Sequence, residues 1–202
     1  MRNIFSPDKG LWRALGVLGD LLILSMLWTL CSMPLVTIGG ATAALYDAVV
    51  KCFRRGDTDY LLQFFRRFRA EWKRGILLSL FWGLLLGAFL FLSSVLLRGL
   101  SAQLKLVAGA VILVFFCLLL GACCWVFPMQ SRFELRFWAV VSNAFRLALG
   151  RLPVSMALAL GTLAAIWLTL HFALIPLMLL PALLALYWSW FIEPVFQTYQ
   201  KE

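Results

Sequence analysis

Few residues in this sequence have side chains that do chemistry, and they lie in or beside apolar runs. There is one histidine, His171, and the five cysteines form no C-x-x-C pair. No P-loop, H-E-x-x-H or G-x-S-x-G motif is present. Because neither a nucleophile with a base nor a metal-ligand cluster can be assembled, we expect no enzyme activity, no metal and no cofactor.

Asp47 is the most informative acid, because it lies inside an apolar run. Ionisable groups within a membrane are costly and are often functional. Lys51 follows four residues later, the order in which an acid and a base pair favourably on a helix. Asp47 is therefore either a functional intramembrane charge or half of an ion pair near the cytoplasmic interface, and both interpretations stay open.

The segment Pro34-Leu-Val-Thr-Ile-Gly-Gly-Ala-Thr separates two apolar runs. Its proline and paired glycines predict a non-helical turn near the outer face of a membrane. Backbone groups freed at such a turn must bond to protein or water, and the threonines could supply partners. The turn is either a tight helical hairpin or a surface that contacts a substrate or partner, in which case the contact residues are Pro34, Thr37, Gly39 and Gly40.

The composition indicates the class of protein. Hydrophobic residues make up 63% of the 202 residues and charged residues 13%, against about 45–50% and 25% in an average soluble domain. This excludes a soluble globular enzyme, and it excludes intrinsic disorder, which needs low hydrophobicity and high charge. The net charge of +9 is typical of basic cytoplasmic loops beside anionic lipid headgroups, and we do not expect nucleic acid binding.

Six apolar segments are long enough to be considered as membrane spans, which take about 20 residues each. They are residues 16–33, 35–52, 75–97, 104–127, 152–170 and 172–192. The sequence therefore predicts an all-α, polytopic membrane helix bundle with about six transmembrane helices, and residues 1–202 are expected to form a single membrane domain.

The segment at 35–52 decides the topology, because it is short and contains an acid. If all six segments span, 16 basic residues lie inside and two outside; if 35–52 is re-entrant, the amino terminus moves outside and the split becomes 13 to five. The excess of basic residues on the cytoplasmic side favours six spans with both termini cytoplasmic.

Two basic amphipathic helices are predicted at the cytoplasmic interface. The first covers residues 60–74, and its apolar positions at helical spacing are Leu61, Phe65, Phe68 and Trp72. Its basic residues on a neighbouring face are Arg66, Arg69 and Lys73. Arg66 and Phe68 are candidate contacts for a cytoplasmic partner, although binding to anionic lipid headgroups explains the same pattern.

The second amphipathic helix is expected to begin at Ser131-x-x-Glu134, which reads as a capping box. Its apolar face comprises Phe133, Phe137, Val140, Ala144 and Ala148.

Because both amphipathic helices lead into a span, residues 16–97 and 104–192 could form a weak internal repeat, or the likeness could be convergent. Gly83 and Gly87 form a G-x-x-x-G pair that could form a homo-oligomer or pack within the bundle.

Four further motifs occur along the chain. The first is Leu27-Trp28 followed by Cys31-Ser-Met-Pro-Leu-Val-Thr-Ile-Gly-Gly-Ala-Thr-Ala-Ala-Leu-Tyr. The others are Phe64-Phe-Arg-Arg-Phe-Arg, Val126-Phe-Pro-Met-Gln-Ser-Arg-Phe-Glu and Ser142-Asn-Ala-Phe-Arg-Leu-Ala-Leu. Together they resemble the motifs of the YesL family of bacterial membrane proteins, whose function is unknown. The remaining candidate contact residues lie in the last two motifs and are Pro128, Arg132, Asn143 and Arg146.

The resemblance implies a multi-pass protein of the bacterial cytoplasmic membrane. Members of the family are often encoded beside carbohydrate-uptake ABC transporters, which implies an accessory role next to an ABC permease. The family has no established catalytic residue to carry over. The alternative, a stand-alone transporter or channel for a small solute, is suggested by the weak repeat, Asp47 and the glycine turn.

Overall fold

The computed structural model describes residues 8–52, 59–133, 135–172 and 178–199, with side chains from residue 16 to residue 197 of these ranges. In the described part every regular element is a helix, as predicted. The elements are α1 (Asp8–Ser32), the 3-10 helix η1 (Leu35–Thr37), α2 (Ile38–Val50), α3 (Tyr60–Arg98), α4 (Ala102–Arg132), α5 (Phe137–Gly150), α6 (Leu152–Phe172) and α8 (Leu180–Tyr199).

Three of these helices, α3, α4 and α6, are long and apolar enough to cross a membrane. Shorter apolar helical segments are found at residues 16–32, 35–50 and 137–150. These lengths and compositions support the predicted class, a helical membrane protein.

The first predicted break is present, but it is shorter than expected. α1 ends at Ser32, just before Pro34, as predicted. The non-helical turn is confined to the residues between α1 and α2, where η1 makes a single turn. Gly39 and Gly40 lie inside α2 instead of in the turn, so the prediction that the glycines break the helix is wrong.

Two predicted helix boundaries are wrong because a proline does not end the helix. α4 continues through Pro128 to Arg132, and α8 continues through Pro194 to Tyr199. Within α4, the Ser131 hydroxyl donates a hydrogen bond of 2.8 Å to the Pro128 carbonyl. Ser131 is therefore not the N-cap of α5; Arg136 occupies that position and makes no side-chain cap bond.

Two other predicted boundaries also change. Residues 60–74 do not form a separate helix but are the first part of α3, which has 39 residues and is about 58 Å long. The predicted span 172–192 is divided, because Phe172 ends α6 and α8 begins at Leu180. Residues 173–177, which contain Pro176, lie outside the described residues.

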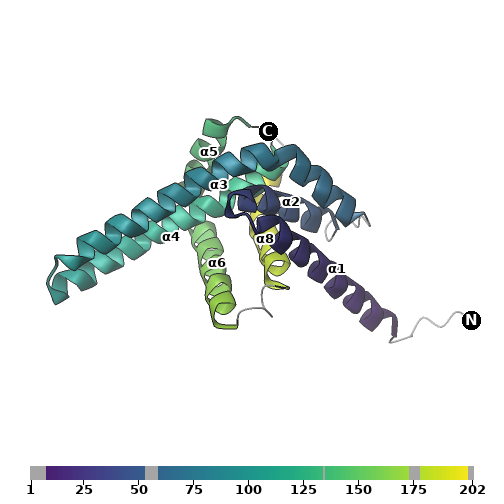
Figure 1. Ribbon diagram of the computed structural model, residues 1–202, viewed down its shortest axis with the longest axis horizontal. Coiled ribbons are helices and arrows are strands. Elements are labelled where there is room, and N and C mark those ends of the chain that lie inside the picture. Colours follow the sequence, from purple (N-terminus) through teal and green to yellow (C-terminus); the bar gives the residue numbers. More distant parts are fainter. Residues whose placement is uncertain (1–7, 53–58, 134, 173–177, 200–202) are drawn as a thin grey trace, which may run out of the picture.

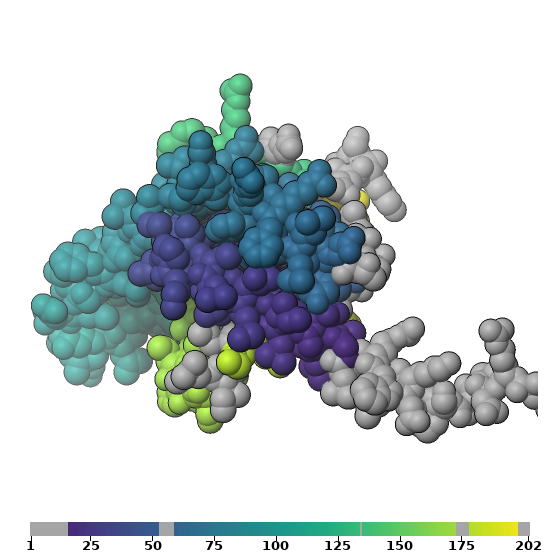
Figure 2. Space-filling view, turned by 45° about the vertical axis from the view of Figure 1, so that its right-hand side comes forward, coloured from purple at the N-terminus to yellow at the C-terminus, as the bar shows by residue number. Residues whose placement is uncertain are grey.

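The helices spread from a common centre (Figure 1). The beginning of α1, the connection between α3 and α4, the end of α6 and the beginning of α8 all point to the lower side of Figure 1. α5 and the end of α8 lie on the opposite, upper side. The outer halves of α3 and α4 form an antiparallel hairpin that stands out from the rest of the molecule, as Figure 2 also shows.

α2 is the central helix. It packs against α1, α3, α4 and α8, and 11 of its residues are buried. It crosses α3 at a contact between backbones: a Cβ atom added to Gly75 would lie 2.6 Å from the Gly40 Cα, and one added to Gly39 would lie 2.6 Å from the Phe127 ring. Only glycine permits this approach, which explains why the paired glycines lie within a helix.

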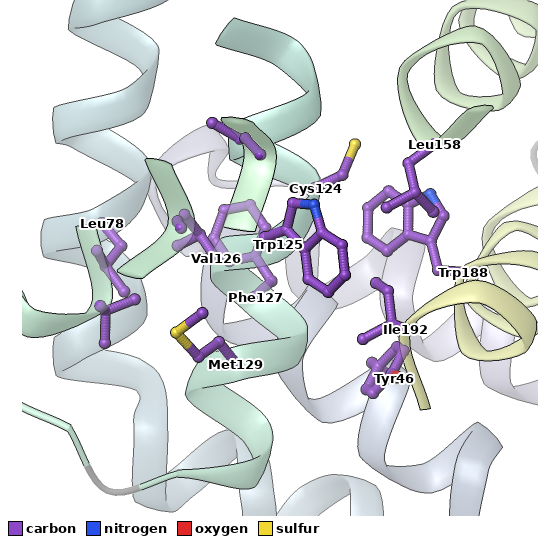
Figure 3. Packing of buried hydrophobic residues seen from close by; sticks show 14 of the residues in the cluster. Tyr46, Leu78, Cys124, Trp125, Val126, Phe127, Met129, Leu158, Trp188 and Ile192 are labelled. Atoms are coloured by element: carbon purple, nitrogen blue, oxygen red, sulfur yellow. The ribbon is translucent and has the colours of Figure 1, made fainter. Parts of the chain in front are cut away.

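The main core joins α2, α3, α4, α5, α6 and α8. Trp125 of α4 and Trp188 of α8 lie close together, with Leu158 and Ile192 around them (Figure 3). Trp125 donates a hydrogen bond of 3.0 Å to the Ser155 hydroxyl of α6. A second cluster joins α1, α2, the first part of α3 and the beginning of α8, so α2 and α3 contribute to both clusters.

Candidate functional site

Polar side chains from four helices meet beside the core, where α2, α3, α4 and α8 approach one another. We call this set the polar layer. It comprises Tyr46, Asp47, Lys51, Arg67, Glu71, Gln130, Ser131, Arg132 and Glu193. Its acids and bases are placed by the same helices that form the core.

An ion pair between Arg132 and Glu193 joins α4 to α8. The guanidinium contacts Glu193 Oε1 through Nη2 at 2.6 Å and through Nε at 3.0 Å. The Tyr46 hydroxyl of α2 donates to the same oxygen at 3.3 Å. The side chains of Arg132 and Glu193 are only 10% and 11% exposed, so three helices share a largely dehydrated charge contact.

A second group of contacts joins α3 to the end of α4. Arg67 Nη2 donates to the carbonyls of Gln130 and Ser131, at 3.1 and 2.5 Å. Gln130 Nε2 donates to the Glu71 carboxylate at 3.1 Å, and Arg67 lies 3.8 Å from that carboxylate. Arg67 therefore neutralises Glu71 and also binds carbonyls in the last turn of α4, which have no partner within the helix.

Asp47 forms the predicted ion pair with Lys51, with 2.7 Å between Oδ2 and Nζ. The Asp47 side chain is 5% exposed and that of Lys51 is 31% exposed. The lysine thus reaches outward from a buried carboxylate, as snorkelling side chains do.

The polar layer balances its own charge, because each of its three acids has a basic partner. In the described ranges no three histidine, cysteine or acidic side chains are close enough to hold a metal ion. Two buried atoms of the layer, Arg67 Nε and Gln130 Oε1, have no hydrogen-bond partner in the described part of the chain. The arrangement therefore links helices electrostatically.

Backbone groups at the turn before α2 form hydrogen bonds within the turn and to α3. The Thr37 hydroxyl lies 2.5 Å from the Cys31 carbonyl and 2.7 Å from the Pro34 carbonyl. The Gly39 N–H donates to the Ser79 hydroxyl of α3 at 2.7 Å. Pro34 is exposed, whereas Gly39 and Gly40 are buried against α3. These contacts account for the turn as a tight hairpin.

The other predicted contact residues lie in three separate places. Arg66 is exposed and Phe68 is half-buried near Gly40, so the inward-facing arginine of this motif is its neighbour Arg67. Pro128 is buried in α4. Asn143 and Arg146 of α5 line a hollow of about 400 Å³ between α4, α5 and α8.

Sequence reasoning missed Arg67, Glu71, Gln130, Tyr46 and Glu193 as members of the layer. Glu71 carried one available signal, because it is an acid between the apolar residues Ala70 and Trp72, whereas Gln130 is followed by the polar residues Ser131 and Arg132. Nothing in the sequence shows that they contact each other.

Comparisons with known proteins agree with the resemblance. A family profile described as "Protein of unknown function, DUF624" matches residues 21–93, which contain the turn, α2 and most of α3. The uncharacterized protein YesL of Bacillus subtilis (strain 168) is 29% identical over 153 residues, which cover 73% of this chain and 70% of that protein. No solved structure matches this chain. The profile match over the glycine crossing and the relative that aligns with most of the chain both support membership of the YesL family of proteins of unknown function.

Proposed function

We propose that the protein is a multi-pass protein of the bacterial cytoplasmic membrane that acts as an accessory component of a carbohydrate ABC-type uptake system. In this role it binds the permease and catalyses no reaction. The family resemblance supports the choice of transporter. The observation that carries the binding role is the α3–α4 hairpin, whose outer half contacts little of the described part of the chain.

We further propose five spans, formed by α1, α3, α4, α6 and α8, with α2 as a buried helix that does not cross. α2 has 13 residues and is about 20 Å long, shorter than the hydrocarbon core of about 30 Å. α1 begins on the side to which the α3–α4 connection points, and α8 ends on the opposite side (Figure 1). This arrangement corresponds to the 13-to-five distribution of basic residues and replaces the six-span topology with cytoplasmic termini.

The hairpin presents apolar side chains on its outer half, including Leu84, Phe91, Leu106 and Val107, all largely exposed. Charged residues flank only its tip, at Arg98 and Lys105, which suits a hairpin that reaches the far membrane surface. Its apolar faces are therefore available to lipid or to the helices of another membrane protein.

An apolar groove of about 560 Å³ separates the hairpin from α5. Leu85, Phe89 and Leu92 of α3 form one wall, and Phe145 and Leu149 of α5 form another. A groove of this size accepts large side chains of a neighbouring helix, which is the contact expected of a subunit that binds a permease.

The test is site-specific crosslinking in the native membrane. A photoreactive residue at Leu92, which is 70% exposed in the groove, is compared with one at Leu170 of α6, which is 78% exposed. We expect the Leu92 variant to form an adduct with the permease of a carbohydrate ABC transporter, identified by mass spectrometry, and the Leu170 variant to crosslink only to lipid. Lipid adducts alone at both positions contradict the accessory role.

The alternative, a stand-alone transporter or channel, depends on Asp47. The burial of Asp47 is consistent with a charge that couples transport to an ion. However, Lys51 already pairs with the carboxylate, so no transported cation is required to neutralise it. A transporter loses coupled flux in proteoliposomes in the Asp47→Asn variant, whereas an accessory component shows no flux of its own in either form.

A further inference from the structure

Arg146 of α5 stands between two hollows on the side of the molecule where α4 and α8 end. The first is about 500 Å³ and lies at the junction of α5 and α6, with Arg151, Pro153 and Val154 in its wall. The second is the hollow of about 400 Å³ between α4, α5 and α8, and Arg146 lines both. One guanidinium can therefore serve a ligand in either hollow.

These hollows combine charge with apolar walls. Arg146 and Arg151 supply two positive charges to the first hollow. Asn143 supplies an amide to the second, whose other walls include Phe133 and Phe196. The ligand that fits such a lining carries a negative charge and an apolar portion.

The two arginines are not neutralised by the described part of the protein. No carboxylate of the described residues lies within 4.0 Å of Arg146 or Arg151. By contrast, Arg67 and Arg132 are paired with Glu71 and Glu193 in the polar layer. Arg146 and Arg151 are therefore free to bind an anion, unlike the two arginines of the polar layer.

The arginines also lie where an apolar flank begins. Leu149 is 60% exposed and precedes Arg151, and Leu152 and Met156 continue an exposed apolar surface along α6. Arginines beside the end of a spanning helix lie at the depth of lipid headgroups, and basic pockets between membrane helices on the cytoplasmic side bind anionic headgroups.

We infer that Arg146 and Arg151 form a binding site for one anionic phospholipid, with the phosphate between the two guanidiniums and the acyl chains along α6. Guanidinium groups bind phosphate oxygens in pairs, which gives a stronger contact than a single ammonium. Asn143 adds a neutral hydrogen-bonding group on the same face of α5 as Arg146. The inference rests on the proposed membrane placement, in which the α5 side is cytoplasmic.

The test measures lipid binding to the purified protein in uncharged detergent by thermal unfolding. The protein is titrated separately with dioctanoyl phosphatidylglycerol, with dioctanoyl phosphatidylcholine and with inorganic phosphate. We expect stabilisation by phosphatidylglycerol alone, and the Arg146→Gln and Arg151→Gln variants to lose about tenfold or more in affinity, as for a charge-assisted contact worth about 1.5–3 kcal/mol. Arg69→Gln is the matched control, because Arg69 is exposed on α3 and lines neither hollow.

Three results overturn the inference. Equal stabilisation by phosphatidylcholine removes the need for a negative charge, and an equal loss of affinity in Arg69→Gln indicates a diffuse basic surface. Competition by inorganic phosphate at the same concentration identifies a soluble phosphate as the ligand instead of a lipid. If Arg146→Gln lowers the unfolding temperature without lipid, Arg151→Gln carries the comparison, because Arg151 is exposed at the junction of two helices. Flotation of the wild-type protein with its native membranes tests the membrane placement by itself. A failure of that placement is therefore distinguished from a failure of lipid binding at Arg146 and Arg151.

Discussion

At the scale of single residues, two groups of charged side chains differ in their partners. Those of the polar layer are paired and connect helices, as in the contact of Arg132 and Glu193. Those around α5, Arg146 and Arg151, have no acidic partner in the described ranges. The first group contributes to stability, because removal of one partner leaves a buried charge without compensation. The second group is available to bind a ligand.

Glu193→Gln tests the first group. It leaves the buried Arg132 guanidinium without an anion, so we expect a loss of about 3–5 kcal/mol of stability and a lower unfolding temperature in detergent. The Arg132→Met/Glu193→Met double variant removes both charges and is expected to be more stable than Glu193→Gln. If Glu193→Gln unfolds at the wild-type temperature, the pair does not hold α4 to α8.

The neighbours Arg66 and Arg67 provide a second test. Arg67→Gln loses the contacts to two α4 carbonyls and to Glu71, so we expect a loss of about 1.5–3 kcal/mol. Arg66→Gln changes an exposed side chain and is expected to cost less than about 0.5 kcal/mol. Thermal unfolding of the two variants measures the difference, and equal effects would show that Arg67 does not bind the end of α4.

The sequence led to Arg66 as the candidate contact instead of Arg67, and this error has a physical reason. The apolar residues Leu61, Phe65 and Trp72 recur at helical spacing, and the structure leaves all three exposed. The residue that faces the protein is Phe64, which is fully buried. Because both faces of this segment are rich in aromatic residues, helical spacing alone does not determine which face meets α2 and α4. The pair of Asp47 and Lys51 was predictable, because both partners lie on one helix.

At the scale of elements, the crossing of α2 and α3 is the contact that tolerates least change. Gly75→Ala would introduce a Cβ 2.6 Å from the Gly40 Cα, which is backbone and cannot move aside alone. We expect a loss of about 1–3 kcal/mol from this overpacking, measured as a lower unfolding temperature. Gly83→Ala on the same helix meets nothing within 4 Å and is expected to be neutral, or more stable by up to about 1 kcal/mol. Equal destabilisation by both substitutions contradicts the close crossing.

The same crossing explains which element boundaries the sequence could predict. Pro34 ends α1 as expected, because proline disrupts the helix before it. Gly39 and Gly40 were expected to interrupt the helix, but they provide the surface on which Gly75 packs. A glycine pair has the same local signature in either case, and only the position of the partner helix distinguishes the two. Gly83 and Gly87 are exposed, so their G-x-x-x-G pair does not pack within the described bundle.

At the scale of the whole molecule, the number of spans depends on α2. Its composition qualified it as a span in the sequence, because burial in protein and burial in lipid require the same apolar residues. The structure surrounds α2 with α1, α3, α4 and α8, so its apolar character is explained without contact to lipid. A buried helix that does not cross leaves an odd number of spans and places the two ends of the chain on opposite sides.

Single cysteines in a cysteine-free background test this topology. We expect Asp8→Cys, at the beginning of α1, and Ser101→Cys, between α3 and α4, to react with a membrane-impermeant maleimide on intact cells. Gln197→Cys, near the end of α8, is expected to react only after the membrane is opened, because it lies on the side of α5. Labelling of Asp8→Cys only after opening would show that α2 crosses and that six helices span. With six spans, Ser101→Cys still reacts from outside and serves as the internal control, because the α3–α4 connection faces outward in both arrangements.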